Sequence, residues 1–89
     1  MKLKGQWLFQ AIALPGGDVA VVCRRPDGSK ATPAEAAECL RMMARHAVSG
    51  ERASELAEHA RGLREFADAV EAGQVEIVDR LPRGARKIG

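Results

Sequence analysis

Large aromatic side chains are scarce in this chain of 89 residues, which holds one Trp, two Phe and no Tyr. Cysteine is also rare, and Cys23 and Cys39 both stand in apolar contexts. Two cysteines cannot supply the several crosslinks of a secreted disulfide scaffold, so we expect two small buried thiols in a cytoplasmic protein. No stretch approaches the ~20 apolar residues of a membrane-spanning helix, and Gln6 and Gln10 interrupt the apolar run near the N-terminus. We therefore expect neither a membrane partner nor a secretory signal.

Residues that carry catalytic or metal chemistry are few and poorly spaced. The candidates Cys23, Cys39, His46 and His59 match none of the close-paired spacings of zinc sites. On a helix, Cys39 and His46 would lie about 10 Å apart, which is too far for a nucleophile and its base. Most acidic residues fall on helix faces among arginines and do not indicate a catalytic carboxylate pair. We expect no enzymatic activity, no metal and no cofactor.

Charge is almost balanced over the whole chain, at +2, but it is unevenly distributed. Residues 1–30 carry five basic and two acidic side chains, and residues 31–79 carry five basic and ten acidic ones. Residues 80–89 carry four basic side chains and no acidic one. A basic end beside an acidic body has two interpretations, because it can fold back on its own helices or reach an acidic partner.

Local patterns predict an α+β fold with the order β-β-α-α-β. Residues 6–14 and 19–23 are β-type runs separated by Pro and two glycines, which predicts a hairpin. Thr32, Pro33 and Glu35 form a capping box that predicts a helix start at Pro33. We expect a second helix over residues 51–72 and a short strand over residues 75–81.

The expected architecture is a small antiparallel sheet, made of the N-terminal hairpin and the short C-terminal strand, packed on an antiparallel helix pair. Residues 1–81 would form this single domain. Pro82 would end the last strand, and residues 82–89 would form a basic C-terminal tail.

The first β-type run is apolar on both faces, which is its most informative property. Trp7 and Phe9 would point to one face, and Leu8, Ile12 and Leu14 would point to the other. One layer of helices covers only one face of a sheet, so the second face needs another cover. A partner surface would supply it, and a homodimer is the simplest such partner.

These observations favour a non-enzymatic protein-binding module, of the kind of small phage or mobile-element inhibitors that occupy the surface of a bacterial host protein or protein complex. The expected partner-binding residues are apolar or polar residues of the first strand, an exposed methionine and the basic side chains. They are Leu8, Gln10, Ile12, Leu14, Arg24, Arg25, Met42, Arg80, Arg83, Arg86 and Lys87. One alternative is a small nucleic-acid-binding or regulatory protein, in which the same basic edge would contact phosphates. Another is a structural subunit of a larger assembly.

Overall fold

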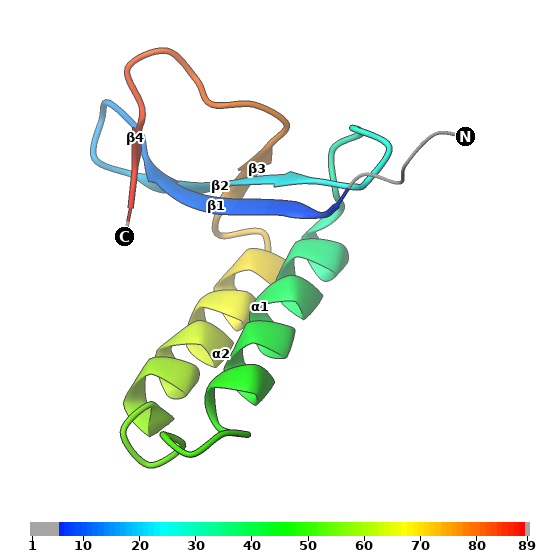
Figure 1. The fold of residues 1–89 in the computed structure, drawn as a ribbon. Coiled ribbons are helices and arrows are strands. Elements are labelled where there is room, and N and C mark those ends of the chain that lie inside the picture. Colours follow the sequence, from blue (N-terminus) through cyan, green and yellow to red (C-terminus); the bar gives the residue numbers. More distant parts are fainter. Residues whose placement is uncertain (1–5, 89) are drawn as a thin grey trace. The chain divides into compact units, whose positions relative to one another are not determined.

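The computed structural model describes residues 6–88 and confirms the α+β class and the β-β-α-α-β order. The elements are β1 (Leu8–Ala13), β2 (Val19–Arg24), α1 (Pro33–Ala47), α2 (Ala57–Glu71), β3 (Glu76–Val78) and β4 (Arg86–Lys87) (Figure 1). They fall into two compact units. Among the described residues, the sheet unit comprises residues 6–32 and 75–88, and the helical unit comprises residues 33–74.

The sheet has four strands in the order β3-β2-β1-β4. The predicted hairpin is present, with Leu8 opposite Arg24 and Ala13 opposite Val19. Its turn is closed by a backbone hydrogen bond in which the Leu14 amide donates to the Asp18 carbonyl over 2.7 Å. Pro15 and two glycines fill this turn, so local turn chemistry alone aligns the two strands.

Two features of the sheet correct the sequence prediction. The sheet is mixed, because β3 runs parallel to β2, with Val21 beside Ile77. A parallel neighbour needs a long crossover connection, which residues 25–75 supply. The segment expected to be a basic tail contributes β4, which pairs antiparallel with β1 and places Lys87 opposite Ile12 (Figure 1).

One face of the sheet is covered by residues of the sheet unit itself. Ile12, Ala20 and Val22 form a buried cluster. Leu14, Val78 and Ala85 are partly buried and pack against this cluster. Ala85 lies in the segment that arches from β3 to β4, so the C-terminal residues cover part of the second face of β1 (Figure 1).

The helical unit is an antiparallel pair of 15-residue helices (Figure 1). As predicted, α1 begins at Pro33, immediately after Thr32. The buried residues of the pair are mostly alanines, which allow close approach of two helices. They are Ala36, Ala37, Leu40 and Ala44 on α1 and Ala60, Ala67 and Val70 on α2.

α2 starts at Ala57 instead of residue 51, and the preceding residues form turns. The Ser49 hydroxyl donates a hydrogen bond to the His46 carbonyl over 3.0 Å, so it ends α1 instead of capping a second helix. No side-chain cap stands at Leu56 either. Without a cap, the amides of the first turn lack side-chain partners, and the helix begins where packing against α1 supports it.

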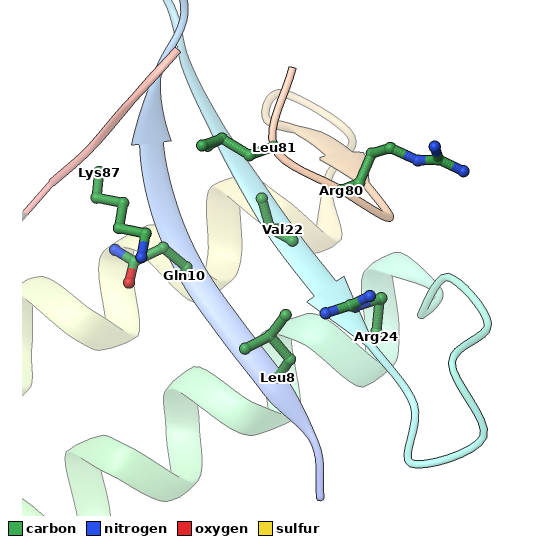
Figure 2. Close-up of a pocket in the computed structure, with 7 residues that line it drawn as sticks. All are labelled: Leu8, Gln10, Val22, Arg24, Arg80, Leu81 and Lys87. Carbon is green, nitrogen blue, oxygen red and sulfur yellow. The ribbon is translucent and has the colours of Figure 1, made fainter. Parts of the chain in front are cut away.

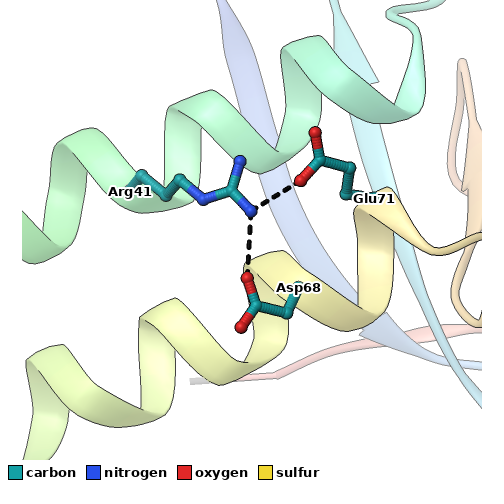
Figure 3. Close-up of polar contacts among 3 residues, drawn as sticks. All are labelled: Arg41, Asp68 and Glu71. Atoms are coloured by element: carbon teal, nitrogen blue, oxygen red, sulfur yellow. Dashed lines mark hydrogen bonds and ion pairs between the residues drawn. The ribbon is translucent and has the colours of Figure 1, made fainter.

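A bridging arginine joins the two helices at their surface. Figure 3 shows the Arg41 guanidinium of α1 between Asp68 and Glu71 of α2, at 3.0 Å and 2.7 Å from their carboxylate oxygens. Hydrogen bonds to Glu71 and then to Asp68 raise the pKa of Arg41. These charge-assisted bonds link α1 to α2 at the surface of the pair, beside the alanine-rich contact.

Candidate functional site

A pocket with an apolar floor and basic walls lies on one face of the sheet unit. Its volume is about 220 Å³. Seven residues from both strands of the hairpin and from the C-terminal segment line it. They are Leu8 and Gln10 of β1, Val22 and Arg24 of β2, and Arg80, Leu81 and Lys87 of the C-terminal segment (Figure 2). The pocket therefore combines a surface for burying a side chain with groups that attract negative charge.

Strand register explains why these residues meet. Leu8 lies opposite Arg24 and Gln10 opposite Val22. Directly opposed residues of neighbouring strands point to the same face, and so do alternate residues of one strand. The four side chains of the hairpin therefore lie on one face of the sheet. The side chain of Lys87 in β4 lies on the same face.

The polar residues of the pocket hold its edges in place. The Gln10 amide donates hydrogen bonds to the Ala11 carbonyl over 2.9 Å and to the Ile88 carbonyl over 3.1 Å. The Ile88 amide in turn donates to the Ala11 carbonyl. These bonds join Ile88 to β1 and hold the neighbouring Lys87 at the edge of the pocket.

The basic groups of the pocket have few acidic neighbours. Within residues 6–88, the Arg24 guanidinium and the Lys87 ammonium make no hydrogen bond or ion pair. Arg80 is 3.9 Å from the carboxylate of its neighbour Asp79, and Figure 2 shows its side chain extending away from the strands. Arg24 and Lys87 lie on opposite sides of the apolar side chains (Figure 2). The two unpaired cations therefore flank the pocket floor.

Five of the residues that the sequence singled out meet at this pocket: Leu8, Gln10, Arg24, Arg80 and Lys87. Ile12 does not, which corrects its predicted place at a partner surface. Its side chain is 0% exposed beneath the C-terminal segment, whereas Leu8 is 38% exposed. If copies of the chain associate through this face, Leu8 makes the contact. Self-association stays a prediction.

The other predicted residues lie elsewhere. Leu14 packs against the buried cluster. Arg25 donates hydrogen bonds to the Ser29 hydroxyl and the Lys30 carbonyl, so it supports the turn after β2. Arg83 and Arg86 are exposed, and Arg86 lies opposite Ala13, on the face away from Lys87.

The same turn holds a second polar contact. The Ser29 hydroxyl and amide donate hydrogen bonds to Asp27, at 2.6 and 2.9 Å, and lower the pKa of that carboxyl. The hydrogen bonds within the turn therefore stabilise the charged carboxylate of Asp27.

Met42 belongs to the helical unit, where it is 48% exposed. With Arg45, His46 and Ser49 it lines a shallow hollow of about 230 Å³ at the end of α1. This hollow has a methionine as its only large apolar side chain, and Arg45 is already paired with Glu38 at 2.9 Å. It offers less to a ligand than the pocket of the sheet unit.

Val22 and Leu81 line the pocket although the sequence did not indicate them. The turn determines the hairpin register, which places Val22 opposite Gln10. The sequence could therefore have predicted Val22 beside the other hairpin residues of the pocket. Leu81 had no such signal, because the sequence placed it at the end of the expected strand over residues 75–81 but did not specify how that strand pairs with the hairpin.

Other kinds of site find no support among residues 6–88. No group of three or more His, Cys, Asp or Glu side chains in this part of the chain could hold a metal ion. None of its helices is long and apolar enough to cross a membrane. Comparisons of the chain with protein-family models, curated proteins and solved structures find no match.

Proposed function

We propose that the chain is a non-enzymatic module that binds an acidic surface of another protein through the pocket of its sheet unit. The observation that carries this proposal is the pair of cations, Arg24 and Lys87, that lack acidic partners within residues 6–88 and flank an apolar floor. Leu8 and Leu81, at 38% and 46% exposure, add accessible apolar surface beside these charges. Protein interfaces typically combine such an apolar centre with a polar rim.

The distribution of charge supports the same choice of partner. Among residues 6–88, the sheet unit carries seven basic and four acidic residues, for a net charge of +3, and the helical unit carries five basic and eight acidic residues, for a net charge of −3. A basic face steers an acidic partner during encounter and disfavours a basic one. Location in the cytoplasm is part of the proposal and is supported by cysteines that are thiols rather than a disulfide.

The proposal favours a protein over a nucleic acid because of the apolar floor. Phosphate-backbone binding needs several cations and gains little from aliphatic surface. Among residues 6–88 the pocket contains no aromatic side chain on which a base could stack. Inhibition of a host protein, as in small phage proteins, stays a prediction within this binding function.

A pull-down from nuclease-treated bacterial lysate tests the proposal. The baits are the wild-type chain, the double variant Arg24→Glu with Lys87→Glu, and the control Arg64→Glu, which changes an exposed charge on α2. We expect one protein in fixed ratio on the wild-type and control baits and its loss from the double variant. Recovery of nucleic acid alone from untreated lysate, or equal recovery by all three baits, would contradict the proposal.

A further inference from the structure

We infer that the pocket of the sheet unit takes one large aliphatic side chain from an extended acidic segment of the partner, with carboxylates two residues before and two residues after it. This inference deepens the proposed protein-binding function and depends on it. It specifies the pattern acidic–any–apolar–any–acidic in the segment that binds. Three features of the pocket carry it: its volume, its floor and the positions of its two cations.

The volume limits the occupant to about one side chain. Pockets that bury whole small-molecule ligands usually measure about 300–1,000 Å³, and this pocket measures about 220 Å³. Leu8, Val22 and Leu81 form its apolar part, and Val22 is only 4% exposed. An aliphatic side chain that enters would contact carbon on three sides. That contact removes apolar surface of both molecules from water and supplies most of the binding free energy.

The positions of the cations set the spacing of the carboxylates. Arg24 lies opposite Leu8, and Lys87 lies opposite Ile12, so the two are offset by four residues along β1. They are also two strands apart in the sheet. Standard strand geometry then separates their Cα atoms by about 16 Å, with the apolar floor between them.

An extended peptide matches this arrangement when its acidic residues are four positions apart. Such residues are about 13 Å apart, and the long Arg and Lys side chains close the remaining distance. Residues i, i+2 and i+4 of an extended segment share one face. The two carboxylates and the central apolar side chain would therefore all face the pocket. Carboxylates also suit the two cations, because an arginine fork can hold both oxygens of one carboxylate.

Titration of the full chain with short capped peptides, followed by NMR, tests the inference at low salt. The first peptide is Asp-Ser-Leu-Ser-Asp, and its isomer Ser-Asp-Leu-Asp-Ser has the same composition with the acids moved to the opposite face. Two further peptides replace Leu by Ala or both Asp by Asn. We expect the first peptide to bind at least about tenfold more tightly than its Ala version and more tightly than the isomer and the Asn version. Its binding should shift the methyl signals of Leu8, Val22 and Leu81.

Matched protein variants keep the result interpretable. Arg24→Gln with Lys87→Gln should weaken binding of the Asp peptide and leave the Asn peptide unchanged, and Arg64→Gln should change neither. Equal affinity for both isomers and for the Ala peptide would overturn the inference. The pull-down would still test the proposed protein-binding function independently. Failure of all peptides to bind would also overturn it. A single-stranded oligonucleotide that shifts the same methyl signals more strongly than any peptide would overturn both proposals.

Discussion

Gln10 and Ile12 lie on the same face of β1, two residues apart, and differ in what covers them. Ile12 is 0% exposed in the cluster with Ala20 and Val22. Gln10 is half-buried and uses its amide to hold the carbonyl of Ile88. The apolar residue thus stabilises the sheet unit from within, while the polar residue fixes the chain segment that forms the pocket wall.

Replacement of Ile12 tests the first of these roles. Ile12→Ala should lower the free energy of unfolding by about 2–5 kcal/mol, because it removes buried carbon and leaves a cavity. Val19→Ala is the control, since Val19 lies on β2 with 42% of its surface exposed. That change should cost under about 1 kcal/mol. Urea unfolding followed by circular dichroism measures both, and similar losses in the two variants would contradict the burial of Ile12.

At the scale of the element, β4 depends on a tight turn at Gly84. This residue has a φ of +83°, in the left-handed region that glycine adopts without strain. A Cβ atom at this position would lie 3.1 Å from Cγ of Pro15 in the hairpin turn. A side chain at residue 84 would therefore crowd Pro15 where the C-terminal segment approaches the β1–β2 turn.

Two alanine substitutions with opposite expected effects test this dependence. Gly84→Ala should destabilise the chain by about 1 kcal/mol or more through backbone strain and the contact with Pro15. Gly62→Ala should stabilise it by about 0.5–1 kcal/mol, because residue 62 lies inside α2 with open space around its Cα. Thermal unfolding measures both changes. Stabilisation by Gly84→Ala would show that this turn does not need glycine.

At the scale of the whole molecule, residues 82–88 have a structural role that their composition did not predict. They supply β4, the packed side chain of Ala85 and the amide of Ile88 that bonds to β1. The basic residues of this segment therefore have two roles. Their backbone completes the sheet, while the Lys87 side chain lines the pocket.

Truncation after Leu81 tests this dual role. The sequence predicted a single domain over residues 1–81 and a basic tail over residues 82–89, so removal of the tail would leave the fold intact. With the structure in hand, we expect the truncated chain to lose its cover over Ile12 and to melt at a lower temperature. Each 1 kcal/mol lost should lower Tm by about 4–8 °C in a domain of this size. Circular dichroism melts of both chains measure the change, and an unchanged Tm would restore the interpretation of the segment as a tail.

The features that the sequence predicted correctly all depend on interactions within a few residues. Pro15 and the following glycines specify the hairpin turn, and Thr32 with Pro33 specifies the start of α1. Alternation along β1 correctly indicated two apolar faces. Three of the basic residues that the sequence proposed for partner binding, Arg24, Arg80 and Lys87, line the pocket, and their role in binding stays a prediction. The start of α2 was placed six residues too early because helical periodicity continues through residues that lack a cap.

Local chemistry by itself determined the hairpin, the beginning of α1 and the α+β class. Only the tertiary structure decided that β3 runs parallel to β2, that the C-terminal segment covers Ile12, and that Arg24 and Lys87 flank one pocket. Turns and caps act through hydrogen bonds between residues close in the chain, so they are visible in the sequence. The pairing of Lys87 with Ile12 joins residues 75 positions apart. This pairing forms only when the C-terminal segment packs against the rest of the sheet. Residues 82–89 contain no periodic pattern that would predict it.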